Sequence, residues 1–309
     1  MSKAKEKKIF KCGMVTIVGR PNVGKSTLLN KLVGEKVAIV SKVPQSTRNQ
    51  IRGMYNDDRG QIIFIDTPGI HLGNDKLDQM MNNASSSTVD QADCVIYLVD
   101  TSRRIGQEEN FIAEKIAAVK KPVILGLNKV DLKGHHLSEY ISFWEKIKGV
   151  PLAEQKNFTM IALSGEKEIN TDQLLDIVYS YLPEGPALYP TDIVCDVPQK
   201  MAMSDIIREK FLELMRDEIP HALGVFIEHI RNKGKDVVLI QAVILVERQS
   251  QKEIVIGKKG DVLKKVGIAA RKELEELLEK KVYLDLLVKT QEDWRDDISI
   301  LQELGYQNF

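Results

Sequence analysis

The chain has 309 residues, a length that accommodates two domains of ordinary size, and a hydrophobic fraction of 43% that suffices for packed cores. Its 44 basic and 44 acidic residues cancel, which excludes a uniformly basic nucleic-acid-binding protein but not a local basic patch. With no apolar run of membrane-spanning length, no signal peptide and three scattered cysteines without a C-x-x-C pair, we expect a cytoplasmic protein with inert thiols.

The extreme N-terminus carries four lysines within eight residues. One interpretation is a solvated, disordered tail. The alternative is contact with RNA or with the anionic inner membrane surface, which would make the protein peripheral on the cytoplasmic face of the cell membrane. The residues concerned are Lys3, Lys5, Lys7 and Lys8.

A glycine-rich loop follows the first predicted strand, residues 14–18, and precedes apolar residues at helical spacing. The loop reads G-x-x-x-x-G-K-S, and a strand and a helix on its two sides are the context that a phosphate-binding loop requires. Its backbone N–H groups would converge on phosphate oxygens at a helix N-terminus, with Lys25 on the β- and γ-phosphates and Ser26 on Mg²⁺. The predicted nucleotide contacts here are Gly19, Arg20, Pro21, Asn22, Val23, Gly24, Lys25, Ser26 and Thr27.

The next two predicted strands, residues 51–55 and 61–65, form an antiparallel pair across the turn 56–60. The second strand ends in an acid followed by Thr-Pro-Gly. An acid at such a strand end can hold Mg²⁺, and the glycine can turn its N–H toward a γ-phosphate. This motif is Asp66, Thr67, Pro68 and Gly69.

Strands are also predicted at 94–99, 122–127 and 158–163, and the second of them runs into the sequence N-K-x-D. The Asp131 carboxylate only accepts hydrogen bonds, so it suits the N1–H and N2–H₂ edge of guanine and would repel adenine. The tetrapeptide alone is a weak signal. Its position at a strand end, after the phosphate loop and D-T-P-G, identifies GTP as the nucleotide, bound by Asn128, Lys129 and Asp131.

Strands and helices alternate through this half of the chain, which predicts an α/β domain with a doubly wound, mainly parallel sheet and one antiparallel edge strand. The nucleotide would lie at the carboxyl ends of the strands. We place this domain at residues 10–183, followed by a proline-rich linker at 184–198.

The remainder predicts a smaller α+β domain at residues 199–290 and a C-terminal helix or tail at 291–309. An amphipathic helix with Ser204 as its N-cap is followed by strands at 225–230 and 237–246. A Gly-Lys-Lys-Gly sequence then leads into a helix that extends through Leu277, and a last strand follows at 282–288.

A G-x-x-G sequence is often only a surface turn. Here it lies in an α-β-β-α-α-β order, which favours a type II KH domain, whose glycine loop clamps the backbone of about four nucleotides. Between Lys252 and Lys272 the chain has seven basic residues and two acids, a local charge that suits phosphates. The predicted RNA contacts are Gly257, Lys258, Lys259, Gly260, Lys264 and Lys265.

The order of these motifs resembles the translation-factor-like GTPases, and D-T-P-G-Ile70 together with the KH domain resembles the bacterial Era family. That resemblance implies a Mg²⁺-dependent GTP hydrolase, acting as a monomer, that binds the 3′ end of 16S ribosomal RNA in rRNA processing and 30S subunit biogenesis. It implies that residues 44–48 form the first switch, with Thr47 on Mg²⁺. It also implies that Ser164 and Gly165 form a base-binding loop, in which Gly165 stands where the family usually has alanine.

Ile70 lies where Ras-like enzymes have a water-orienting glutamine, so intrinsic hydrolysis is expected to be slow. Two hypotheses remain: a GTPase switch that controls RNA binding, and a nucleotide-regulated RNA-binding module with negligible hydrolysis. The resemblance further implies that Asn22 ligates K⁺ beside the phosphates in place of the missing group. The alternative is that Asn22 only forms hydrogen bonds within its loop.

Overall fold

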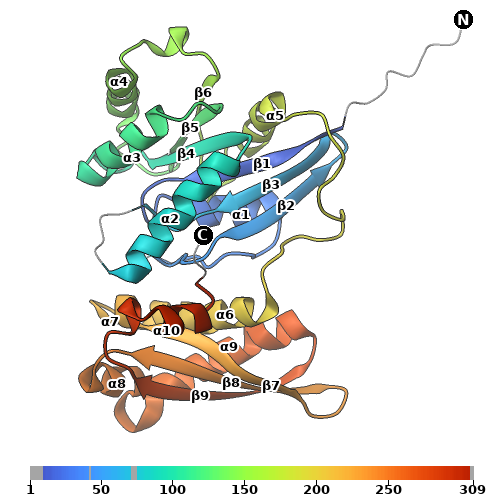
Figure 1. Ribbon diagram of the computed structural model, residues 1–309, viewed down its shortest axis with the longest axis vertical. Helices are drawn as coiled ribbons and strands as arrows, with labels where there is room; N and C mark the ends of the chain where they lie inside the picture. The colour runs from blue at the N-terminus through green and yellow to red at the C-terminus, as the bar shows by residue number, and fades with distance from the viewer. Residues whose placement is uncertain (1–9, 42, 71–74, 307–309) are drawn as a thin grey trace, which may run out of the picture. The chain divides into compact units, whose positions relative to one another are not determined.

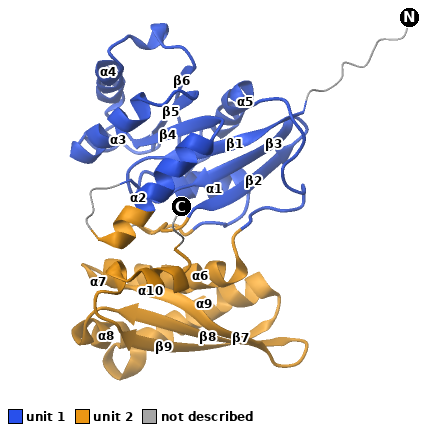
Figure 2. Cartoon of the chain, viewed as in Figure 1, with its two compact units in different colours: residues 1–38, 50–72, 81–196 blue, residues 39–49, 73–80, 197–309 orange. Residues whose placement is uncertain are grey.

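The computed structural model describes residues 10–41, 43–70 and 75–306. Its contacts divide the chain into two compact units, which Figure 2 shows in different colours. Unit 1 consists of residues 1–38, 50–72 and 81–196, and unit 2 consists of residues 39–49, 73–80 and 197–309. None of the helices in the described part of the chain is long and apolar enough to cross a membrane.

Unit 1 contains a six-stranded sheet in the order β2-β3-β1-β4-β5-β6. All neighbouring pairs are parallel except β2 with β3, which confirms the predicted doubly wound sheet with an antiparallel edge. The strands are β1 (Lys11–Val18), β2 (Ile51–Asp57), β3 (Gly60–Asp66), β4 (Cys94–Asp100), β5 (Val123–Asn128) and β6 (Phe158–Ala162).

Helices cover both faces of this sheet; in Figure 1, α2 crosses in front of the strands and α1 lies behind them. Every residue of β3, β4 and β5 is buried, as expected for strands covered on both faces. The helices are α1 (Lys25–Val33), α2 (Lys76–Gln91), α3 (Gln107–Ala117), α4 (Leu137–Lys148) and α5 (Thr171–Tyr181), with a short 3₁₀ turn at Leu152–Glu154.

The proline-rich segment at 184–196 is bound along the edge strand β2 of unit 1. The Met54 N–H donates to the Val194 carbonyl (2.8 Å), and Arg52 forms an ion pair with Asp196 at 3.1 Å. The Gln61 side chain accepts hydrogen bonds from the backbone N–H groups of Leu188 and Tyr189. The segment therefore covers a sheet edge that would otherwise expose unpaired backbone groups.

Unit 2 contains a three-stranded sheet in which β7 (Gly224–Asn232) pairs antiparallel with β8 (Val237–Val246), and β8 pairs parallel with β9 (Lys281–Thr290). Apolar residues of α6 (Gln199–Leu214) and α9 (Asp261–Leu278) form one core with this sheet. The predicted α-β-β-α-α-β order is confirmed. The remaining helices are α7 (Ile219–Ala222), α8 (Gln249–Ile256) and α10 (Ile298–Glu303), with 3₁₀ turns at Lys258–Gly260 and Trp294–Asp296.

The prediction that Ser204 caps α6 is wrong. The helix begins at Gln199, five residues before Ser204 and directly after Pro198, and the Ser204 hydroxyl donates to the Lys200 carbonyl within the helix (2.9 Å). Proline is compatible with a helix start because its ring fixes φ near the helical value and its missing N–H is not needed there.

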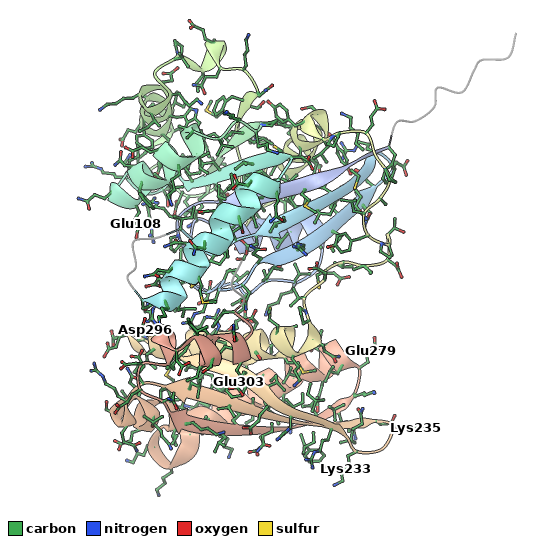
Figure 3. All side chains as sticks on the ribbon, viewed as in Figure 1. Glu108, Lys233, Lys235, Glu279, Asp296 and Glu303 are labelled. Atoms are coloured by element: carbon green, nitrogen blue, oxygen red, sulfur yellow. The ribbon has the colours of Figure 1, made fainter. Side chains whose placement is uncertain are left out.

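Two short segments from the first half of the chain belong to unit 2. In residues 39–49, the guanidinium of buried Arg48 donates to the carbonyls of Leu223 (2.9 Å) and His221 (3.0 Å) and lies over the Trp294 ring. In residues 73–80, Asp75 forms an ion pair with Arg295 at 2.6 Å. Asp296, which Figure 3 labels, accepts a hydrogen bond from the backbone N–H of Lys76 (2.9 Å).

Candidate nucleotide-binding and RNA-binding sites

The predicted phosphate loop joins β1 to α1, and Gly24 forms the N-cap of the helix with φ 102°. A Cβ atom at Gly24 would lie 2.5 Å from the side-chain nitrogen of Asn128, so this close approach requires glycine. The ammonium of buried Lys25 donates to the carbonyls of Gly19 (3.3 Å) and Arg20 (3.1 Å) within the loop. Burial lowers the pKa of Lys25, and nearby Asp66 opposes that shift.

Of the three residues predicted to hold Mg²⁺, Ser26 and Asp66 lie together and have the chemistry that suits that ion. The Ser26 hydroxyl and the Asp66 carboxylate are 2.6 Å apart at the end of β3, and Asp66 is fully buried. Hydroxyl and carboxylate oxygens are the hard ligands that Mg²⁺ prefers, and when bound the ion neutralises charge on the β- and γ-phosphates. Thr67 fixes the adjoining turn by donating to the Ile17 carbonyl (3.0 Å). Thr47 belongs to unit 2, and its approach to the metal stays a prediction.

The N-K-x-D segment at the end of β5 forms direct hydrogen bonds with the phosphate loop. The Asn128 side chain donates to the Val23 carbonyl (2.7 Å) and accepts from the Gly165 N–H (3.0 Å). Lys129 donates to the Asn22 carbonyl (2.8 Å). Asp131 is exposed beyond them. Asn128 thus brings together the three predicted nucleotide loops, those at 19–27, 128–131 and 164–165.

The Ile70 side chain is buried among apolar residues. It is 3% exposed and belongs to an apolar cluster that includes Val18 and Val95. This burial agrees with the sequence-based expectation that the residue after Gly69 does not orient a water molecule.

Sequence reasoning missed three buried polar residues next to these loops, namely Asp100, Glu109 and Tyr140. Asp100 was detectable, because it ends an apolar strand at the same sheet edge as Asp66 and Asn128. Glu109 also leaves a signal, since it shares the buried face of α3 with apolar residues at helical spacing. No sequence signal marks Tyr140, because a tyrosine on the apolar face of an amphipathic helix is usually a core residue.

The Gly-Lys-Lys-Gly loop joins α8 to α9 with left-handed backbone at Gly257 (φ 75°), Lys259 (φ 55°) and Gly260 (φ 77°). A Cβ atom at Gly257 would lie 2.5 Å from a methyl group of Val262 and 2.9 Å from its backbone nitrogen, so only glycine fits there. The side chains of Lys258, Lys259, Lys264 and Lys265 are all at least partly exposed. The loop and the first residues of α9 therefore present four cations, two from each, near a helix N-terminus, where the helix dipole also favours phosphate.

Comparison with known proteins agrees with both halves of this description. Residues 14–129 match the family described as 50S ribosome-binding GTPase, and residues 218–295 match the KH domain family. The fold and sites thus define a class of protein, a GTPase domain joined to a KH domain.

Two solved structures narrow this class. A crystal structure of Era with MgGDPNP and nucleotides 1506–1542 of 16S ribosomal RNA matches at 36% identity and a TM-score of 0.89, covering 96% of this chain and 99% of that one. A crystal structure of a point variant of Era from Aquifex aeolicus, bound to GDP and AlF₄⁻, matches with the same values. The chain therefore belongs to the Era family.

Proposed function

We propose that this chain is a Mg²⁺-dependent GTPase whose nucleotide state controls how its KH domain holds the 3′ end of 16S ribosomal RNA, in rRNA processing and 30S subunit biogenesis. The observation that supports it best is that one chain combines three joined guanine-nucleotide loops with a lysine-bearing glycine loop. The RNA target rests on membership of the Era family, since a solved Era structure contains that RNA segment.

The surface around the glycine loop suits single-stranded RNA. Beside the four lysines, Ile254 on α8 is 51% exposed and Ile268 on α9 is 57% exposed. In KH domains the G-x-x-G loop clamps the nucleotide backbone, where lysines can neutralise phosphates, and the two exposed isoleucines offer an apolar surface to unstacked bases.

The path of the chain favours a switch over a passive RNA-binding module. Thr47, the predicted Mg²⁺ ligand of the GTP state, directly precedes Arg48, which is bonded to two backbone carbonyls of unit 2. A conformational change at Thr47 would therefore act on the next residue, Arg48, and through its hydrogen bonds on the KH domain. A two-state element that both sites bias is what coupling between the sites requires.

Single-turnover hydrolysis of GTP, with and without an RNA of the 16S 3′ sequence, tests this function. We expect slow turnover by the protein alone, because Ile70 is buried and apolar, and faster turnover with the RNA. Lys25→Ala is the control that should abolish both rates. If no hydrolysis is detected with or without the RNA, while RNA binding still depends on the nucleotide, the result would support the alternative of a regulated RNA-binding module.

Potassium is expected to accelerate hydrolysis relative to sodium at equal ionic strength, if the Asn22 side chain ligates a monovalent cation that offsets charge between the β- and γ-phosphates. Asn22 has φ 62°, a conformation that glycine also adopts without strain. Asn22→Gly and Asn22→Ala should both abolish the potassium effect, with Asn22→Gly retaining GTP affinity. Equal phosphate release in the two salts by the wild type would contradict the cation site.

We further propose that the protein acts as a monomer in the cytoplasm and contacts the 30S subunit. A peripheral association with the inner membrane surface would depend on the four N-terminal lysines, which lie outside the described residues. Flotation with vesicles containing anionic lipid, comparing the full chain with a variant in which these lysines are replaced by serine, would test that association.

A further inference from the structure

A buried carboxylate beside the phosphate loop holds the arginine of that loop. Glu109 on α3 is fully buried and forms an ion pair with Arg20 at 2.5 Å. The Tyr97 hydroxyl donates to the same carboxylate at 2.5 Å. Burial raises the pKa of Glu109, while Arg20 and Tyr97 oppose that shift. A buried charged group of this kind is costly unless it is paired, so the position of Arg20 is tightly restrained.

The same arginine contacts Tyr140 on α4, which packs beside α3 (Figure 1). Arg20 donates to the Tyr140 hydroxyl at 3.2 Å, and that hydroxyl donates in turn to the backbone carbonyl of Asp100 at 3.1 Å. Tyr140 is 1% exposed, so water does not compete for either bond. A single hydroxyl thereby links the phosphate loop to the end of β4.

Asp100 continues the chain of contacts to the base loop. Its carboxylate accepts from the Lys129 ammonium at 2.7 Å, and from the backbone N–H and hydroxyl of Ser102 at 3.0 and 2.6 Å. Burial acts to raise the pKa of Asp100, but these hydrogen bonds outweigh it and leave the pKa below its ordinary value. Lys129 also donates to the Asn22 carbonyl in the phosphate loop, so the contacts form a closed circuit.

We propose that this circuit of Glu109, Arg20, Tyr140, Asp100 and Lys129 is a positioning device that fixes the phosphate loop relative to the base loop and so slows nucleotide release. The inference rests on the proposed binding of guanine nucleotide by these loops. A buried ion pair is weak evidence for stability, because apolar replacements are often neutral. Two members of this circuit, Arg20 and Lys129, however, lie in loops that are predicted to hold the nucleotide.

Tyr140→Phe is the sharpest test, because it removes one hydroxyl and leaves the aromatic ring and every charge in place. We expect a fluorescent GDP analogue to dissociate roughly three- to tenfold faster, the factor that one buried hydrogen bond contributes. Tyr181→Phe is the matched control: its hydroxyl also makes a hydrogen bond in unit 1, to Thr159 at 2.7 Å, away from the nucleotide loops. The Tyr181→Phe variant should release the GDP analogue at the wild-type rate.

A second variant separates positioning from general destabilisation. Asp100→Asn should also speed dissociation, and combined with Tyr140→Phe it should give less than the product of the two separate fold-changes, because both act on one circuit. Thermal unfolding of each variant without nucleotide measures any general loss of stability separately from the change in dissociation rate.

The inference would be overturned if Tyr140→Phe released the GDP analogue at the wild-type rate. It would also be overturned if the fold-changes of Tyr140→Phe and Asp100→Asn simply multiplied in the double variant. Neither result would call nucleotide binding into question. Failure of the wild-type chain to bind the GDP analogue would instead remove the proposed function.

Discussion

Replacing Asp131 by asparagine is expected to exchange the preference for GTP for a preference for XTP. The carboxylate would accept from both N1–H and N2–H₂ of guanine, and asparagine replaces one acceptor by a donor that suits the O2 carbonyl of xanthine. Losing one charge-assisted hydrogen bond of about 1.5–3 kcal/mol predicts a fall in GTP affinity of about 10- to 100-fold. Competition of GTP and XTP against a labelled nucleotide measures the exchange.

The structure permits a clean control for this change. Asp131 is exposed, so the substitution should leave folding unchanged, and Ser26 and Asp66 should give the same dependence on Mg²⁺ concentration. Asp192→Asn makes the same chemical change at another exposed carboxylate of unit 1 and should not alter nucleotide choice. If Asp131→Asn bound GTP as tightly as the wild type, the guanine contact would have to lie elsewhere.

The parallel sheet, and the places where the predicted nucleotide loops leave it, could be predicted from sequence because local patterns dictate them. The apolar runs of β3, β4 and β5 are continuous, as burial on both faces demands, and each loop motif follows directly from such a run. Gly24 and Gly257 were identified from their motifs alone, and the structure supplies the physical reason for glycine, because a side chain at either position would collide with neighbouring atoms.

The features that sequence did not disclose are those set by distant contacts. Arg48 reads as an ordinary polar residue of a loop, yet carbonyls some 175 residues later in the chain bind its guanidinium. The circuit through Tyr140 joins two loops and two helices by side-chain hydrogen bonds that no local pattern encodes. The α6 start was misjudged because serine is favoured as an N-cap in general, while Pro198 decides this case.

Reversing two charges in the glycine loop is expected to separate the two activities of the chain. In a Lys258→Glu, Lys259→Glu variant the loop would repel phosphates, and we expect the affinity for the 16S 3′ sequence to fall by about 100-fold or more, because phosphate contacts dominate such affinities. Basal GTP hydrolysis should persist, since the predicted nucleotide loops lie in unit 1. Filter binding and phosphate release measure the two activities on the same sample.

The matched control makes the same charge change at the opposite end of the KH sheet. Lys233 and Lys235 lie on the turn between β7 and β8 (Figure 3), whereas the glycine loop follows α8, beyond the other end of β8. A strand of this length separates its two ends by roughly 30 Å at about 3.3 Å per residue, well beyond a Debye length in physiological salt. We therefore expect Lys233→Glu, Lys235→Glu to retain most of the affinity. An equal loss in both variants would mean that RNA binds through the general charge of the domain. Full affinity in the Lys258→Glu, Lys259→Glu variant would show that Gly257 to Gly260 is only a turn between helices.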